Sequence, residues 1–317
     1  MRPICDGLAV RITSAQRWPL LLACATMACA STPVARRATL ISDADVAAKA
    51  AVAREASLDP SKIPPRTFAI VPFNVAATDT LLQPLSYGLA DLLLNDLAMS
   101  PMLRLVERVQ TDAILRELDL VDQGIADPRQ APRVGRLVGA RQILIGDAAR
   151  GNAGAVRLSA RVVDVIGGTV QDLVHAEAPL DRVIDAEKAL ALLLFERLGI
   201  QLTPAQRQRI EQRQTTQLAA LVAYGRGVQA EARGDATGAT AAFEDAARLD
   251  AAFTAARTQA AAAPASSAQR ANSVARVLDL AAQAVNAPVA TRVAEAVDAP
   301  LAASSLLQIL ITVRVTP

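Results

Sequence analysis

Apolar segments of two different periods alternate between Thr67 and Val170, and this alternation constrains the fold more than any other feature of the chain. Phe68 to Phe73 is apolar on both alternating faces, which predicts a strand covered on both sides. Thr80 to Met99 then predicts a helix, because it is followed by Pro101 and carries a leucine stripe at positions 82, 85, 89, 92 and 93.

The same alternation continues through the next hundred residues. It predicts a strand at 103–106, helices at 109–120 and 129–138, and a strand at 142–146. Helices placed between strands imply a layered α/β arrangement. From Val156 the apolar residues recur at every second position, and Gly167-Gly168 predicts a tight turn. Two more strands should therefore form a hairpin with one solvent-exposed face. A helix from Leu180 to Leu198 should close the domain at Gly199.

Three stretches of this block resemble the CsgG-like family: Ile70-Val71-Pro72-Phe73, Gly88 through Leu118, and Val134 through Val170. The best-known members of that family build the curli secretion channel of bacterial outer membranes, and their periplasmic core is similar to the amino-terminal domain of TolB. The resemblance implies an α/β (α+β) mixed-sheet domain of the CsgG/TolB-N type at residues 66–200. It also implies a cell-envelope protein that is not an enzyme.

Glu107 and Arg108 match the Glu-Arg pair that follows the second strand in the CsgG-like pattern, which makes them candidates for protein binding. A structural role is the other interpretation, and the one we favour. At a strand-to-helix corner such a pair can cap the helix and form an ion pair that contributes little at the surface.

The first thirty residues have the features of a secretory signal. Three arginines outnumber the single acid Asp6, and the apolar run from Trp18 to Ala28 is too short to span a bilayer. We therefore expect residues 1–30 to be a signal peptide. Residues 31–65 combine an alanine-rich helical stretch with three prolines, and we expect them to be a spacer.

Two cysteines of this signal lie in boxes that resemble lipoprotein cleavage sites, Leu21-Leu22-Ala23-Cys24 and Thr26-Met27-Ala28-Cys29. Lipidation at Cys29, or alternatively at Cys24, would anchor the chain in the bacterial outer membrane facing the periplasm. Ordinary cleavage would instead release a soluble periplasmic protein. Removing three bases and one acid from the 33 basic and 31 acidic residues leaves equal numbers, which argues against a nucleic-acid partner.

A helical, tetratricopeptide-like (TPR-like) region is predicted at residues 203–286. Tyr224 to Phe253 resembles one such repeat, in which Gly227 and Ala239 let two antiparallel helices approach while Phe243 fills the groove between them. A single repeat cannot bury its own face, so neighbouring helices at 255–262 and 273–285 should support it. We take Tyr224, Gly227 and Phe243 as protein-binding candidates, with other envelope proteins as the expected partners.

The C-terminal segment, residues 287–317, contains a strand pattern in an otherwise helical half. Its apolar face holds Leu307, Ile309, Ile311, Val313 and Val315, and Gln308, Leu310, Thr312 and Arg314 alternate with them. The predicted strand at 306–315 either returns to an edge of the α/β sheet, which we favour, or pairs with another chain.

Catalytic signatures are few. His175 is the only histidine, so any histidine-based catalytic or metal site must use it, yet its place near a strand end favours a structural or solvated role. The three cysteines all fall in the first tenth of the chain, and no phosphate loop, nucleophile elbow or zinc-binding helix motif is present. We therefore predict no catalytic residue, no metal and no cofactor.

Three functions follow from these features. The leading hypothesis is an outer-membrane lipoprotein that acts as a non-enzymatic protein-binding or assembly module, in curli-like secretion or outer-membrane assembly. The alternative is an accessory subunit of a CsgG-type secretion channel, which would make the chain part of a homo-oligomer. The third is an activator of a cell-wall synthase or an unrecognised hydrolase.

Overall fold

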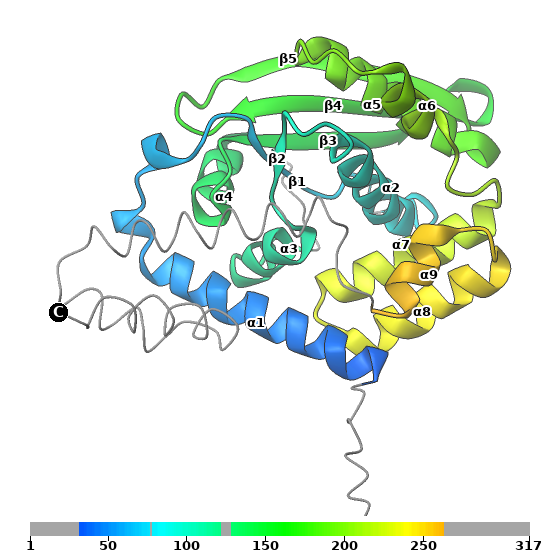
Figure 1. Cartoon of the computed structure of the whole chain (residues 1–317), viewed down its shortest axis with the longest axis horizontal. Helices are drawn as coiled ribbons and strands as arrows, with labels where there is room; N and C mark the ends of the chain where they lie inside the picture. Colours follow the sequence, from blue (N-terminus) through cyan, green and yellow to red (C-terminus); the bar gives the residue numbers. More distant parts are fainter. Residues whose placement is uncertain (1–31, 77, 122–127, 263–317) are drawn as a thin grey trace, which may run out of the picture. The chain divides into compact units, whose positions relative to one another are not determined.

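The computed structural model describes residues 32–76, 78–121 and 128–262 (Figure 1). Three predictions lie outside these residues: the signal peptide with Cys24 and Cys29, the helix at 273–285, and the terminal strand at 306–315. Within them the chain forms an α/β sheet domain and a set of C-terminal helices, which confirms the predicted fold class.

The sheet has five strands in the order β2-β1-β3-β4-β5. Strand β1 (Thr67–Ile70) runs parallel to β2 (Arg104–Leu105) on one side and to β3 (Gln142–Arg150) on the other. Strands β4 (Ala155–Asp164) and β5 (Val170–Pro179) then extend the sheet in antiparallel register. The sheet is therefore mixed, with the predicted hairpin on its outer side.

Helices cover both faces of this sheet, which is why β1 and the first part of β3 are apolar at almost every position. Phe68 and Ile70 point into a large core with α2 (Leu82–Leu97) and α5 (Val183–Arg197). The alternate residue Ala69 points into a second core with α3 (Arg108–Glu117) and α4 (Ala131–Val138). The predicted leucine stripe of α2 is buried in the first core.

Four helices follow the sheet domain: α6 (Pro204–Glu211), α7 (Leu218–Ala232), α8 (Ala236–Leu249) and α9 (Thr254–Ala260). Short 3-10 turns connect other elements at Glu55–Ser57, Pro60–Lys62, Pro128–Gln130, Asn152–Gly154 and Leu180–Arg182. Thr203 and Gln206 form a capping box that starts α6. The helix after Leu180 ends as predicted before Gly199, which has φ +65°.

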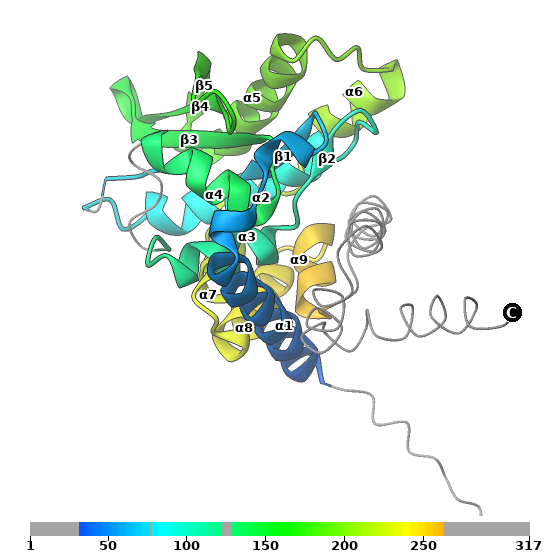
Figure 2. The ribbon, with the colours of Figure 1, turned by 90° about the vertical axis from the view of Figure 1, so that its left-hand side faces the viewer.

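The segment that the sequence analysis assigns to a spacer is instead part of the fold. Residues Pro33–Ala53 form helix α1, which packs against α3, α4 and α8 (Figure 2). One side of α1 is buried, at Arg37, Ile41, Ala44 and Ala48. The spacer interpretation is wrong for this helix, because its stripe of small alanines gives a weak apolar pattern in sequence yet lets the helices pack closely.

The helical pair α7 and α8 packs directly onto the sheet domain. A Cβ atom added at Gly225 of α7 would lie 2.0 Å from the carbonyl oxygen of Pro84 in α2, so the two backbones touch. Within the pair, a Cβ at Gly227 would lie 2.7 Å from the ring of Phe243 on α8, which is the contact expected of these two residues. The two parts therefore share one apolar core. The domain boundary near residue 200 stays a prediction.

Candidate functional site

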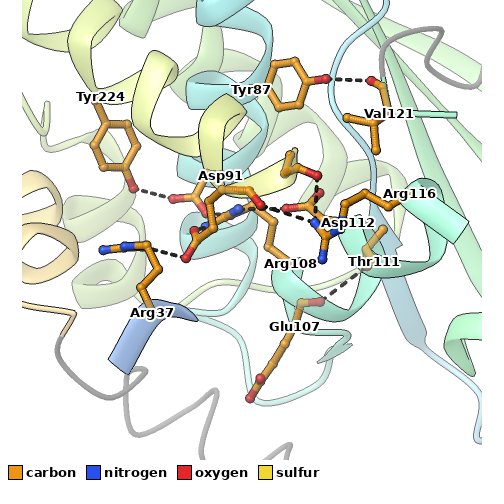
Figure 3. A network of polar contacts seen from close by, with 12 residues as sticks. Arg37, Tyr87, Asp91, Glu107, Arg108, Thr111, Asp112, Arg116, Val121 and Tyr224 are labelled. Atoms are coloured by element: carbon orange, nitrogen blue, oxygen red, sulfur yellow. Dashed lines mark hydrogen bonds and ion pairs between the residues drawn. The ribbon is translucent and has the colours of Figure 1, made fainter. Parts of the chain in front are cut away.

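A buried cluster of charged residues lies where α1, α2, α3 and α7 meet, and we call it the charged junction (Figure 3). Its centre is Arg108, the first residue of α3, whose side chain is 13% exposed. Arg108 Nε lies 2.6 Å from Oδ1 of Asp91, and Arg108 Nη1 lies 2.8 Å from Oδ2 of Asp112. Arg108 Nη2 pairs with Oε2 of Glu231. The junction consists of Arg37, Asp91, Arg108, Asp112, Tyr224 and Glu231.

Arg37 brings α1 into the junction. Its side chain is 2% exposed, and its Nη1 lies 2.6 Å from Oε1 of Glu231. Its Nε donates to Oγ1 of Thr240 at 3.2 Å, and its guanidinium lies 4.7 Å from the ring centroid of Phe243, in cation–π geometry. Its Nη2 donates to the carbonyl oxygen of Gln259. Arg37 thus joins α1 to α7, α8 and α9 with a single side chain.

Tyr224 joins α7 to α2 on the other side of the junction. Its hydroxyl donates to Oδ2 of Asp91, and its ring packs on those of Phe243 and Phe253, with centroids 5.3 Å and 4.9 Å apart. Burial, followed by the charge of Asp91, raises the pKa of Tyr224 well above its ordinary value. The hydroxyl therefore keeps its proton and serves as a fixed donor to Asp91.

The junction holds three carboxylates and two guanidinium groups. The carboxyl groups therefore differ in how far burial and the nearby arginines shift their pKa. Burial raises the pKa of Asp112 to about 6, although Arg108 lowers it. Burial also raises the pKa of Glu231, but Arg108 and Arg37 outweigh it, so that pKa is lowered overall. Burial therefore raises the pKa of Asp112 toward neutral pH, whereas the pKa of Glu231 stays below its ordinary value.

Arg116 lies one helical turn beyond Asp112 on α3, at the edge of the junction. Its Nη2 lies 2.6 Å from Oδ1 of Asp45 on α1, and its Nη1 donates to the carbonyl oxygen of Ala232 at 2.7 Å. That carbonyl belongs to the last residue of α7, where a cation complements the negative end of the helix. Arg116 of α3 therefore contacts both α1 and α7.

Two of the five predicted protein-binding candidates lie at the start of α3, and the other three lie between helices α7 and α8. Glu107 is the extended residue that precedes α3, and its carbonyl oxygen accepts a hydrogen bond from Thr111 at 3.4 Å. Arg108 does not remain in a local surface pair, because its guanidinium turns inward to acids on other helices. Tyr224, Gly227 and Phe243 are buried between helices. Direct binding by these residues stays a prediction, and any such role would act through the helices that they hold together.

Sequence reasoning missed four members of the junction: Arg37, Asp91, Asp112 and Glu231. Asp91 carried a readable signal, because it interrupts the run Gly88-Leu89-Ala90-Asp91-Leu92-Leu93 on a helix whose neighbouring positions are all buried. A buried acid of this kind requires a partner. Arg37 and Glu231 gave no such signal, since their pairing joins positions 194 residues apart.

A second buried charge cluster joins α2 to α5. Lys188 Nζ lies 2.6 Å from Oδ2 of Asp96 and 3.1 Å from Oε2 of Glu187, and all three side chains are at most 6% exposed. Burial and the neighbouring Asp96 raise the pKa of Glu187 well above its ordinary value. One lysine faces two acids, so the cluster is closest to neutrality when Glu187 keeps its proton.

An apolar groove of about 590 Å³ lies along the helical pair. Its lining comes from Leu81 beside α2, the start of α7 and the end of α8, and its residues are Leu81, Leu218, Ala219, Val222, Ala223, Arg226, Asp245, Arg248 and Leu249. Leu249 is 46% exposed. Asp245 pairs with Arg248, whereas no ion pair is recorded for Arg226 within the described residues. The groove therefore combines an apolar floor with an excess of positive charge.

Other chemistry is sparse among the described residues. They contain no group of three or more histidine, cysteine, aspartate or glutamate side chains arranged to hold a metal. His175 is exposed on β5, directly opposite Ser159 of β4. None of the described helices combines the length and the apolar character needed to cross a membrane.

Comparison with known proteins identifies the first part of the domain. The family described as curli production assembly/transport component CsgG matches residues 66–150, from the start of β1 to the end of β3. The LpoB C-terminal domain from Salmonella enterica is 22% identical over 36% of this chain and 82% of that domain, but its TM-score of 0.31 supports no conclusion about this chain. No curated protein matches. The family match includes Asp91, Arg108 and Asp112 of the junction and confirms that residues 66–150 are CsgG-like, as the sequence predicted.

Proposed function

We propose that this chain is a cell-envelope lipoprotein that binds or assembles other envelope proteins without catalysing a reaction. The match to a family described by assembly and transport supports the envelope role. The apolar groove on α7 and α8 is the observation that carries the binding role, because its apolar lining beside charged side chains can receive the apolar face of a partner segment.

The chemistry of the groove indicates the kind of segment that it binds. Its apolar floor fits the apolar face of a helix or an extended segment, and Arg226 with Arg248 at its edge favours an acidic residue on that segment. The charged junction supports this role by keeping α7 in place, since Tyr224 and Glu231 hold α7 against α2 and α3. A groove on a rigid helix pair loses little conformational entropy on binding.

Crosslinked envelopes offer a direct test, with the tagged chain used to capture its partners. Leu249→Glu and Ala219→Arg place charges on exposed positions of the groove, and Leu40→Glu makes the matched change on α1, where Leu40 is 50% exposed. We expect both groove variants to lose at least about tenfold of the captured partner. The Leu40 variant should keep it. Capture of the same proteins by wild type and both groove variants, or of none by wild type, would count against the proposal.

The membrane anchor needs its own test. We infer that Cys29, or alternatively Cys24, carries the lipid and holds the chain at the outer membrane facing the periplasm, because both boxes end in the small residue and cysteine that lipoprotein processing needs. Mass spectrometry of the mature amino terminus distinguishes the two cysteines. An unmodified terminus after ordinary cleavage would instead indicate a soluble periplasmic protein.

An accessory subunit of a CsgG-type secretion channel is the second candidate, since the matching family is described as a component of curli transport. Such a subunit should form a ring or join one. Native mass spectrometry of the detergent-extracted protein separates the two roles, because a stable oligomer of defined number favours the channel subunit and a monomer favours the binding module.

A further inference from the structure

Strand β5 forms one edge of the sheet, and its outer side is open among the described residues. It is ten residues long and pairs with β4 alone. The opposite edge strand, β2, has only two residues. Long edge strands present a row of unpaired backbone groups, and proteins normally cover or interrupt them. In β5 the only proline is Pro179, its last residue, and the register with β4 is irregular between Gln171 and Val174, so the regular edge open to a further strand runs from Val174 to Pro179.

Helix α5 provides cover for such a strand. It packs mainly over β5 and less over β4, so it lies above the edge of the sheet and not above its centre (Figure 1). Leu193 of α5 remains 36% exposed, and Leu192 is only partly buried. A strand added beyond β5 would bring its inward side chains beside this helix, next to Ala176 and Ala178 of β5. The opposite face, with His175 and Glu177, is exposed.

We propose that residues 307–315 of this chain add to β5 as a sixth strand. Their alternation places five apolar side chains on one face, which suits the side of the sheet under α5. The other face carries Leu310 among the polar residues Gln308, Thr312 and Arg314, and these three suit the exposed side beside His175 and Glu177. These nine residues are enough to cover the regular part of the edge, Val174 to Pro179. The chain between Ala262 and Leu307 is long enough to reach this edge, since an extended chain spans about 3.3 Å per residue.

Hydrogen exchange of the full-length protein tests the pairing. The outward amides of residues 170–179 should exchange slowly, because they donate to the added strand. The double variant Ile309→Asp with Ile311→Asp places charges on the apolar face, and we expect exchange in 170–179 to rise at least about tenfold while residues 155–164 are unchanged. Gln308→Asp with Thr312→Asp is the matched control on the exposed face and should leave exchange as in wild type.

A crosslinking measurement covers the case in which the double aspartate variant unfolds. Glu177→Cys on the exposed face of β5 should form a disulfide with a cysteine introduced at 308, 310 or 312, but not with Ile311→Cys on the opposite face. Fast exchange of the outward β5 amides in wild type, or no crosslink at any of the three positions, would overturn the proposal. Protection or crosslinking that disappears on dilution would also overturn it, because the strand would then belong to a second copy of the chain.

Discussion

Arg108 on α3 and Glu231 on α7 form an ion pair across 123 residues of sequence, with side chains that are 13% and 6% exposed. This pair joins the CsgG-like segment to the helical pair, because Arg108 also binds Asp91 and Asp112 within that segment while Glu231 also binds Arg37 of α1. The packing of α1, α3 and α7 therefore depends on one shared set of charges.

Removal of Arg108 should strongly destabilise the fold. Arg108→Met leaves Asp91 and Asp112 buried without their guanidinium partner and leaves Glu231 with Arg37 alone, and breaking a buried pair of this kind costs about 3–5 kcal/mol in the free energy of unfolding. Urea denaturation followed by circular dichroism measures the loss. The matched control is Arg133→Met, which removes an exposed pair with Glu55 and should cost less than about 1 kcal/mol. Equal costs for the two variants would contradict the central role of Arg108.

Asp112 should make stability depend on pH. Its pKa is about 6 in the folded chain and 3.8 in the unfolded chain, so between those values the folded state binds more protons than the unfolded state. Raising the pH through this window therefore lowers stability, by up to about 3 kcal/mol for a shift of this size. In Asp112→Asn this contribution is absent.

The difference in unfolding free energy between wild type and Asp112→Asn isolates this contribution from the other carboxyl groups. The unfolding free energy of wild type minus that of Asp112→Asn should decrease as the pH rises from about 4 to about 6 and then level off. Urea titrations at several pH values measure it. A difference that stays constant across this range would show that Asp112 has an ordinary pKa in the folded chain.

Tyr224→Phe tests the hydrogen bond apart from the packing. The phenylalanine ring keeps the contacts with Phe243 and Phe253 but leaves Asp91 without its hydroxyl donor. A hydrogen bond to a charged group contributes about 1.5–3 kcal/mol, and we expect a loss in that range. Tyr224→Leu should cost more, since it also removes the ring contacts. Wild-type stability of the phenylalanine variant would show that water replaces the hydroxyl.

The close approach of α7 to α2 should not tolerate a side chain at Gly225. Gly225→Ala puts a methyl group 2.0 Å from the carbonyl oxygen of Pro84, so the helices must separate, and overpacking of this kind costs about 1–3 kcal/mol or more. Gly151→Ala is the matched control, because the nearest atom there lies at an ordinary 3.4 Å. Thermal unfolding should show a lower midpoint for the first variant alone.

The cluster at Lys188 should respond differently to its two neutralising substitutions. Glu187→Gln puts a neutral side chain of the same shape where burial and Asp96 already raise the pKa of the acid and so favour its neutral form, and the change should be within about 1 kcal/mol. Lys188→Met leaves Asp96 and Glu187 buried without their cation and should cost about 3–5 kcal/mol. A large cost for Glu187→Gln at pH 7 would mean that Glu187 is ionised in the folded protein.

The sequence by itself determined the order and type of the elements from β1 to α5 and those of the helical pair with α9, whereas α6 was not predicted as a separate helix. Periodicity was sufficient because the sheet is covered on both faces at β1, wet on one face at the hairpin, and connected by amphipathic helices. The same patterns carried the CsgG-like resemblance of residues 66–150 and the contact between Gly227 and Phe243. These features are local, so each can be read within a window of one or two elements.

Only the tertiary structure decided the role of α1 and the membership of the charged junction. Arg37, Arg108 and Glu231 lie far apart in the chain, and the periodicity of any one segment contains no information about which charge meets which. Burial strengthens these pairings, because a charge removed from water needs an opposite charge beside it. The fold chooses the partner by bringing four helices to one point, and that convergence is a property of the packed molecule and not of any stretch of its sequence.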